Sequence, residues 1–436
     1  MILRKRLENF LFYSIIFCLP LNLGKHFILN LCYVNGRLVD YLIPTLYVQD
    51  ILVVALLLVS FPKLLKSLPK LLDFRVFAFL ILFVVVGFFS VSSAYSFIPS
   101  VYFLFRLVLY LGFGVYIFLC RSFSKDSVSI AEILGVLLVG LGFLAIFQWF
   151  NQSSVFNNYL FFGEQPYSFS TPGIVREGIF GFSKIPPYGI FKHPNVFAAF
   201  LSFCLLFLLP LLKKKNTSVF LYLSWLLGFI ALLLTFSWFV LLGFLVCLVL
   251  FLMPVKFLKF GFMVLLSLAF LFHLALFFAP IKTFDLSSLT FLPFTSDSLV
   301  RRKNLLIAGT SLFRESPLFG VGPNNFTFFV DTLFLDLGST KFTQPIHNIY
   351  LLIFVEFGIF GGVLFLLFLG SLISKCLQGI SKLSERTENC RILLILLLNL
   401  LFLGFFDHFL LTSHQILLTF WLTVGFSLQY NTVDAV

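Results

Sequence analysis

Charged residues are scarce in this sequence: Asp, Glu, Lys and Arg make up 11% of its 436 residues, whereas hydrophobic residues make up 60%. A soluble domain has about 25% charged residues, and long uncharged apolar runs are typical of bilayer spans. The scarcity therefore excludes an ordinary soluble globule and predicts an all-α, polytopic membrane protein. The net charge of +12 is then no sign of a nucleic-acid partner, because basic residues accumulate in the cytoplasmic loops of membrane proteins.

Cysteine pairs, acidic clusters and a cleavage signal are also missing. The 7 Cys include no zinc-type C-x-x-C pair, which argues against a disulfide scaffold or a zinc finger. The segments that we expect outside the membrane contain no D-x-D and no clustered carboxylates, so the sequence predicts neither a metal nor another cofactor. The basic and apolar start lacks a small-x-small cleavage site, and we expect an uncleaved first helix.

Long apolar runs are what the sequence has instead, and they predict about twelve membrane-spanning helices. These runs cover residues 8–24, 44–61, 76–93, 97–119, 129–150, 193–212, 218–235, 237–254, 260–279, 348–374, 391–406 and 410–429. Most of the 30 Lys and Arg residues fall on one side, mainly in short loops, which predicts a cytoplasmic-membrane protein with both termini in the cytoplasm. The expected parts are residues 1–192 with five helices and a first outer loop, 193–279 with four helices, the large extracytoplasmic loop 280–347, and 348–436 with three helices.

The large outer loop contains one helical pattern. SDSLVRRKNLLIAGTSLFRE has the periodicity of an amphipathic helix that ends near Glu315, and the Pro- and Gly-rich SPLFGVGPNN follows it. A loop this long in a compact protein is usually functional or disordered, and this one has helix periodicity.

Polar side chains gather at the predicted outer face. All 6 His lie at or near it, Asp407 ends the eleventh predicted span, and Arg106 lies inside the fourth. A charge at that depth usually faces a polar cavity or a partner. We therefore expect one cationic pocket that opens outward. Structural interpretations stay open. Arg106 would then snorkel or pair with a buried carbonyl, and Asp407 would be the partner of a nearby Arg. The basic run 301–303 would be a solvated surface or a contact for lipid headgroups.

Five motifs follow one another along the second half of the chain. They are FKHPNVFAAFL (191–201), LTFSW (234–238), RRKNLLIAGTSLFRESPLFGVGPNNF (301–326), HNIYLLIFVEFGIFGG (347–362) and FFDHFLLTSHQ (405–415). Over roughly 186–415 this succession resembles the O-antigen ligase/polymerase superfamily of membrane glycosyltransferases. The resemblance implies a helical enzyme of the GT-C type on the outer side of the cytoplasmic membrane. Such an enzyme moves a glycan from a polyprenyl-diphosphate carrier to a hydroxyl of a glycan, lipid or protein acceptor.

The resemblance also implies roles for particular residues. The catalytic residues would be His347, Arg301 or Arg302, and Asp407. Arg106 falls where related enzymes often carry a basic residue in an early span. From their positions at the outer face, we expect the substrate-binding residues to be Arg106, Lys192, His193, Asn195, Asn348, His408 and His414. One position departs from the pattern, because many members have Arg where this chain has Trp238. The missing cation would then come from Lys192, Arg301, Arg302 or Arg106.

The chemistry of a lipid diphosphate suits these residue types. An arginine fork holds phosphate bidentately and stays charged, so it stabilises the leaving group. An imidazole has a reference pKa of about 6.5, which suits a base that deprotonates an acceptor hydroxyl. We therefore expect direct displacement at the anomeric carbon, without a metal, and with the polyprenyl tail among membrane lipids and Phe-rich helices.

Several functions remain open at this stage. The superfamily contains ligases, repeat-unit polymerases and protein glycosyltransferases, and we favour the ligase because of the HN motif and the long outer helix. A flippase or transporter of lipid-linked sugars also fits the helices and the intramembrane Arg106, although no internal repeat is evident. A third interpretation is a non-catalytic scaffold in a surface-polymer complex, which Trp238 favours because many family members have Arg at this position.

Overall fold

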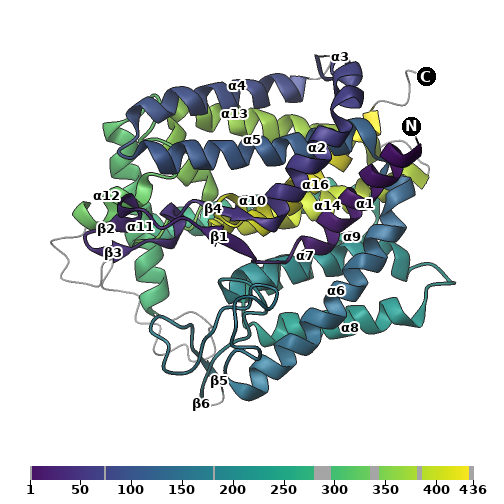
Figure 1. Cartoon of the computed structure of the whole chain (residues 1–436), viewed down its shortest axis with the longest axis horizontal. Coiled ribbons are helices and arrows are strands. Elements are labelled where there is room, and N and C mark those ends of the chain that lie inside the picture. The colour runs from purple at the N-terminus through teal and green to yellow at the C-terminus, as the bar shows by residue number, and fades with distance from the viewer. Residues whose placement is uncertain are drawn as a thin grey trace.

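The computed structural model describes residues 2–72, 75–179, 182–278, 296–333, 343–380 and 385–431. Within these ranges the chain is mainly α-helical (Figure 1). The helices are α1 (Ile2–Cys18), α2 (Val48–Ser67), α3 (Pro69–Leu72), α4 (Arg75–Ser90), α5 (Phe97–Cys120), α6 (Phe123–Asn151), α7 (Pro194–Leu212), α8 (Val219–Leu234), α9 (Trp238–Leu252), α10 (Val255–Phe278), α11 (Ser296–Glu315), α12 (Phe326–Leu333), α13 (Ile349–Ile380), α14 (Glu385–Phe406), α15 (Phe409–Thr412) and α16 (His414–Ser427). The all-α prediction is confirmed, and the assignment to the GT-C type stays a prediction.

Strands occur as three short antiparallel pairs in the described part of the chain. They are β1 (Gly24–His26) with β4 (Thr45–Tyr47), β2 (Tyr33–Val34) with β3 (Arg37–Leu38), and β5 (Glu177–Ile179) with β6 (Phe182–Lys184). All three pairs fall in segments that connect long helices. They shape loops and do not form a layer of the core.

A helix lies over each predicted apolar run. Among the described residues, 8 helices are long and apolar enough to cross a membrane by length and composition, and α8 and α9 are shorter apolar helices. A multi-pass membrane protein is therefore confirmed, whereas the number of twelve spans stays a prediction. A helix is also present where the sequence predicts one in the large loop, since α11 ends at Glu315, whereas its position on the outer side stays a prediction. Residues 279–295 and 334–342 of that loop lie outside the described residues.

Segments predicted to share one side of the membrane lie together. At one end of the bundle, Arg121 Nη1 donates to Asn9 Oδ1 (2.6 Å), and Gln429 Nε2 donates to the carbonyl of Arg121 (2.9 Å). At the end where α11, α12 and the β2–β3 hairpin lie in Figure 1, Asn324 Nδ2 donates to the carbonyl of Tyr41 (2.9 Å). The arrangement is consistent with the predicted alternation, and which end faces the cytoplasm stays a prediction.

The most enclosed candidate spans are α14 and α7. In their apolar windows, 89% and 78% of the residues are buried, against 22% in α10. Asp407 directly follows the end of α14, and Asn195 lies in the first turn of α7.

Two of the motifs hold α11 against α13. Gly358 interrupts α13 with φ 67°, and the backbone of the SPLFGVG turn fills the break. There Ile359 N donates to Pro317 O (2.8 Å) and Val321 N donates to Val355 O (2.9 Å). A Cβ on Gly358 would lie 2.1 Å from the carbonyl oxygen of Leu318, so only glycine fits. These motifs fix the outer helix relative to the start of α13.

The first outer loop, 151–192, is tied to the end of α6. Gln148 is fully buried, donates to Glu164 Oε1 (2.7 Å) and accepts from Gly189 N (2.8 Å). Glu164 in turn accepts from the backbone N–H groups of Val155 (2.8 Å) and Phe156 (2.6 Å). This buried network orders the loop that carries β5 and β6 and brings it to the start of α7.

Candidate functional site

Asp407 lies at the centre of a cluster of polar side chains, in the bend that follows α14. It is 8% exposed, and its two carboxylate oxygens face different partners. Oδ1 accepts a hydrogen bond from the backbone N–H of His408 (2.8 Å), while Oδ2 accepts from Asn195 Nδ2 (3.2 Å). The carboxylate is therefore held by α7 as well as by its own chain segment.

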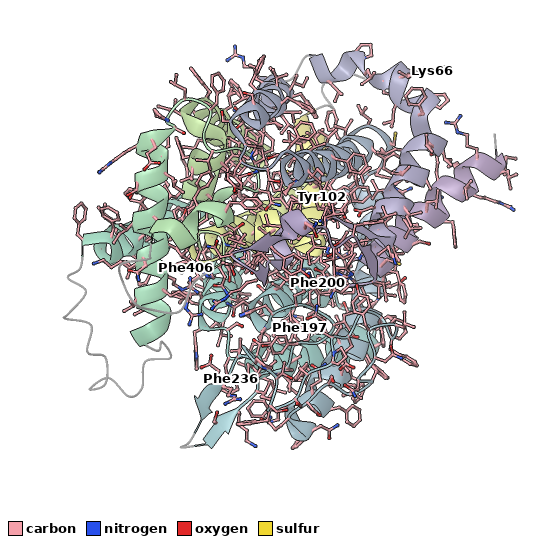
Figure 2. The ribbon with its side chains drawn as sticks, turned by 60° about the vertical axis from the view of Figure 1, so that its left-hand side comes forward. Lys66, Tyr102, Phe197, Phe200, Phe236 and Phe406 are labelled. Atoms are coloured by element: carbon pink, nitrogen blue, oxygen red, sulfur yellow. The ribbon has the colours of Figure 1, made fainter. Side chains whose placement is uncertain are left out.

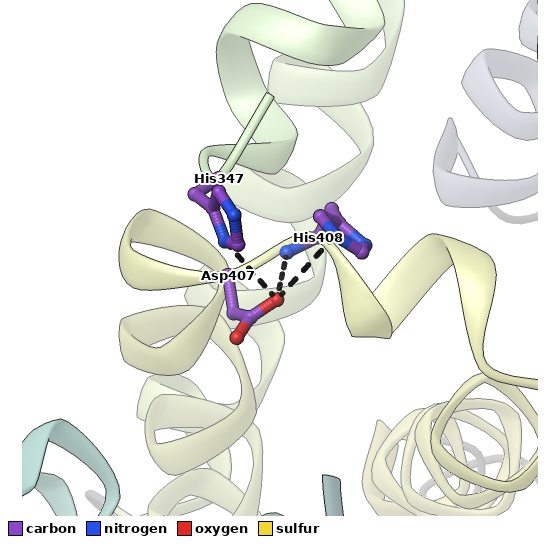
Figure 3. Close-up of side chains that lie close together, drawn as sticks. All are labelled: His347, Asp407 and His408. Carbon is purple, nitrogen blue, oxygen red and sulfur yellow. Dashed lines mark hydrogen bonds and ion pairs between the residues drawn. The ribbon is translucent and has the colours of Figure 1, made fainter. Parts of the chain in front are cut away.

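His347 approaches Asp407 from the start of α13 (Figure 3). Its Nδ1 lies 3.6 Å from Asp407 Oδ1, and its Nε2 lies 3.4 Å from Gln344 Oε1. Asn348 fixes this position, because its Oδ1 accepts from Leu351 N (3.0 Å) and caps α13 directly after the imidazole. The predicted substrate-binding residue Asn348 is thus buried and acts as a helix cap.

A second imidazole completes the cluster. His408 Nε2 lies 3.9 Å from Asp407 Oδ1, and the ring centroids of His408 and His347 are 5.0 Å apart. The other ring nitrogen, Nδ1, lies 2.8 Å from Thr412 Oγ1, which holds the ring in place. His408 is 5% exposed, so it supports Asp407 and is not open to solvent.

The H-P-N motif builds the start of α7. His193 is the N-cap, and its Nδ1 accepts from the backbone N–H of Asn195 (3.1 Å). Pro194 suits the first helical position because its missing N–H has no intrahelical partner there. The side chain of Asn195 then bridges Asp407 and Ser237, whose Oγ donates to Asn195 Oδ1 (2.9 Å).

Arg302 brings a cation to this cluster from α11. Its Nη1 donates to the carbonyl of Phe406, the residue before Asp407, and its guanidinium lies 5.4 Å from the ring centre of Phe239. The neighbouring Arg301 also belongs to α11, but it does not line the cavity beside Asp407.

A cavity of about 100 Å³ lies beside Arg302 and Asp407. Figure 2 labels Phe236 and Phe406, two of the residues that bound it. The lining residues are Glu177, Asn195, Phe236, Ser237, Trp238, Phe239, Val240, Arg302, Leu403, Phe406, Asp407 and Phe409. Trp238 and Arg302 therefore share one cavity. Of the four cations considered for the missing family arginine, Arg302 is the one that the structure places there.

Burial and charge set the protonation states in the cluster. Burial lowers the pKa of His347, and the neighbouring Asp407 only partly offsets this effect. Burial also lowers the pKa of His408, to about 3. Burial by itself raises the pKa of Asp407, but the imidazoles of His347 and His408 and the guanidinium of Arg302 beside it bring the pKa below the ordinary value. Asp407 is thus ionised and His347 neutral near pH 7.

The same three residues can also hold a metal ion. One potential ligand atom from each of His347, Asp407 and His408 lies within 4.8 Å of the others. Two imidazoles and a carboxylate are a donor set that suits zinc or iron. The sequence did not combine these residues into a metal site, and metal independence stays a prediction.

Three predicted site residues lie elsewhere in the structure. Arg106 pairs with Asp50 (3.6 Å) and donates to the carbonyl of Thr45 (2.6 Å), so the structural interpretation of Arg106 describes its contacts. His414 stacks on Tyr47 with ring centroids 3.5 Å apart. Lys192 lies 3.9 Å from Asp40. None of these three residues lines the cavity beside Asp407, and their substrate roles stay predictions.

Other lining residues were not expected from the sequence. Ser237 and Trp238 lie in the LTFSW turn, which the sequence marks as a motif without assigning a role to either hydroxyl or ring. Glu177 lies in the first outer loop, where no periodicity or motif points to it. Their position at the cavity depends on how the loops fold over α7 and α9.

A comparison with protein families matches residues 221–366 to the family described as O-antigen ligase. Over this segment, which is less than half of the chain, the sequence is similar to the O-antigen ligase superfamily. The matched segment includes Trp238, Arg301, Arg302 and His347, whereas Asn195 and Asp407 join the site through geometry. The resemblance is thus confirmed for this segment, and the chain is an O-antigen ligase- or polymerase-like membrane protein. No curated protein matches the chain.

Proposed function

We propose that this protein is an O-antigen ligase-like glycosyltransferase of the cytoplasmic membrane. It takes a glycan from a polyprenyl-diphosphate carrier and joins the glycan to an acceptor hydroxyl on the outer side. The observation that carries this proposal is the pairing of His347 with Asp407 (3.6 Å) beside the Arg302 cavity, within a chain that is similar to this superfamily.

Arg302 is suited to bind the diphosphate of the donor. A diphosphate concentrates negative charge as its bond to the anomeric carbon breaks, and a guanidinium in a cavity shielded from water stabilises that charge. Arg302 is anchored through one nitrogen on the carbonyl of Phe406, which leaves other N–H groups for phosphate oxygens. The ring of Phe239, whose centre lies 5.4 Å from the guanidinium, lowers the polarity around this cation.

His347 is suited to act as the base that deprotonates the acceptor hydroxyl. Asp407 faces Nδ1, which favours the tautomer with the proton on Nδ1 and the lone pair on Nε2. In the proposed step, the acceptor hydroxyl gives its proton to Nε2, and its oxygen forms the new bond to the anomeric carbon. The bond between that carbon and the diphosphate oxygen breaks, and the carrier diphosphate leaves with the electron pair.

Asn195 and Ser237 position the carboxylate in this scheme. The chain of hydrogen bonds from Ser237 through Asn195 to Asp407 leaves the carboxylate little freedom to turn away from His347. Such outer contacts commonly fix the orientation of a catalytic carboxylate.

Reconstitution tests this function directly. The purified full-length protein in proteoliposomes, given a glycan on undecaprenyl diphosphate and a panel of glycan and lipid acceptors, should form a glycosylated acceptor and release carrier diphosphate. A ladder of longer carrier-linked glycans would instead identify a repeat-unit polymerase. Movement of the lipid-linked glycan across the bilayer without any new glycosidic bond would refute the enzyme and favour a flippase.

A further inference from the structure

One carboxylate that lines the cavity has no role in the proposed reaction. Glu177, the first residue of β5, lines the same cavity as Arg302 and Asp407. Burial raises its pKa to about 7, and no cation or hydrogen-bond donor among the described residues offsets that burial. A half-buried carboxylate without donors is unfavourable in the free protein. A ligand that brings hydroxyl donors to Glu177 would remove this penalty.

An aromatic wall accompanies this carboxylate. Trp238 begins α9, lines the cavity and is 41% exposed, so part of its indole surface is available to a ligand. Phe236 meets it edge-on, with ring centroids 6.1 Å apart and an interplanar angle of 71°. The negative face of an aromatic ring attracts the C–H groups of a sugar ring, whose carbon-bound hydrogens carry partial positive charge.

We propose that Glu177 and Trp238 form the acceptor-sugar subsite of the cavity. Trp238 packs against one face of a neutral pyranose, and the carboxylate of Glu177 accepts hydrogen bonds from hydroxyl groups of the same ring. This inference rests on the proposed function and adds the class of acceptor. It assigns both residues to positioning and specificity rather than to proton transfer.

Charge decides which substrate this end of the cavity takes. A carboxylate repels a diphosphate, so the donor's anionic group is expected at Arg302 and not at Glu177. The acceptor is the substrate that needs no charge. Its hydroxyls match the ionised carboxylate of Glu177, which only accepts hydrogen bonds and predominates above about pH 7. A uronic acid at this place would bring a second carboxylate close to Glu177 and is therefore disfavoured.

Direct binding of simple glycosides tests the subsite without requiring transfer. The full-length protein in nanodiscs is titrated with the methyl glycosides of glucose, galactose, N-acetylglucosamine and glucuronic acid, followed by Trp fluorescence and saturation-transfer NMR. At least one neutral glycoside should bind saturably, and the glucuronoside should bind more weakly. Glu177→Ala and Trp238→Ala should each weaken neutral binding about tenfold or more, whereas Trp238→Phe should keep most of it.

Two further variants make the result specific. Asp40→Asn removes a carboxylate that is 61% exposed and pairs with Lys192, so it should leave glycoside binding unchanged. Glu177→Gln keeps the shape but removes the charge, so it should narrow the gap between the glucuronoside and the neutral sugars. The inference fails if no glycoside binds saturably, or if neutral binding is the same in Glu177→Ala and Trp238→Ala as in the parent protein.

The experiments distinguish a failure of the proposed subsite from a failure of the proposed function. If glycoside binding depends on Glu177 but the reconstituted protein never transfers a glycan, the function is wrong and the sugar site stands. If transfer proceeds and the acceptor KM is unchanged in Glu177→Gln and Trp238→Ala, the function stands and the subsite is wrong. If both proposals hold, these variants raise the acceptor KM about tenfold while the donor KM stays constant.

Discussion

At the scale of single residues, the proposed chemistry depends on the protonation of His347. Burial lowers its pKa below the ordinary value of about 6.5, although Asp407 partly opposes this shift. A base must be neutral, so activity is lost as the pH falls through this lowered pKa. At saturating acceptor, where binding at Glu177 no longer limits the rate, we expect kcat to be constant between pH 7 and 8 and to fall with a midpoint below about 6.5.

The pH profile of the variant Asp407→Asn gives a second test of His347 as the base. Removing the carboxylate takes away the charge that favours imidazolium, so the acidic limb should move to lower pH while the plateau falls about 100-fold or more. A pH profile that rises toward acid, or a limb that moves upward in this variant, would be incompatible with His347 as the base.

Metal chelation distinguishes a role of His347 in proton transfer from a role of His347, Asp407 and His408 as metal ligands. Because the proposed step needs only the proton acceptor of His347 and the charge of Arg302, dialysis against EDTA should leave glycan transfer unchanged within about twofold. Metal analysis of the purified protein should then show less than one equivalent of zinc or iron. Loss of transfer on chelation, with recovery on adding one metal, would instead assign His347, Asp407 and His408 as ligands.

The sequence predicted some residues of the candidate site and missed others. His347, Asp407 and Asn195 were expected from motifs at the mouths of predicted spans, and they do meet. Arg106 was expected in the same pocket, and the sequence did not predict its pairing with Asp50 of the second predicted span. Glu177 gave no signal, because only the folding of the first outer loop over α7 brings it to the cavity.

At the scale of elements, the junction between α11 and α13 requires glycine at position 358. Gly358→Ala should destabilise the protein by at least about 1–2 kcal/mol, because a Cβ disfavours positive φ and collides with the turn at Leu318. The measurement is the fraction of monodisperse protein that survives heating in detergent. Gly370→Ala, in the same helix with open space at the Cβ position, is the matched control and should lose no stability. Equal loss in both variants would show that the break at Gly358 contributes nothing.

Elements with strong periodicity were predictable, and irregular ones were not. α11 follows from its amphipathic pattern, and α7 and α13 begin within one residue of their predicted starts. The pair β5–β6 and the short helix α12 were missed. Their sequences carry no strict alternation, and their conformations depend on burial against neighbouring segments such as the Glu356 carboxylate that accepts from Phe326 N (3.3 Å).

At the scale of the whole molecule, the account requires that α11 and the site face away from the cytoplasm. Arg314 in α11 and Lys214 after α7 are both exposed, and they lie on opposite predicted sides. In intact cells with a permeable outer envelope, an impermeant maleimide should label Arg314→Cys and not Lys214→Cys, above the background of the parent chain with its 7 free cysteines. Labelling of Lys214→Cys alone would invert the topology and place the cavity on the wrong side for the proposed reaction.

The central claim is that His347 activates the acceptor while Arg302 holds the donor diphosphate, and one paired measurement tests it. Single-turnover transfer and donor binding are followed in proteoliposomes for the parent protein, His347→Ala and Arg302→Ala. The account predicts that His347→Ala lowers the transfer rate about 10²–10⁴-fold with the donor Kd unchanged. It predicts that Arg302→Ala weakens donor binding and lowers the transfer rate together. Transfer at the parent rate in His347→Ala would contradict it.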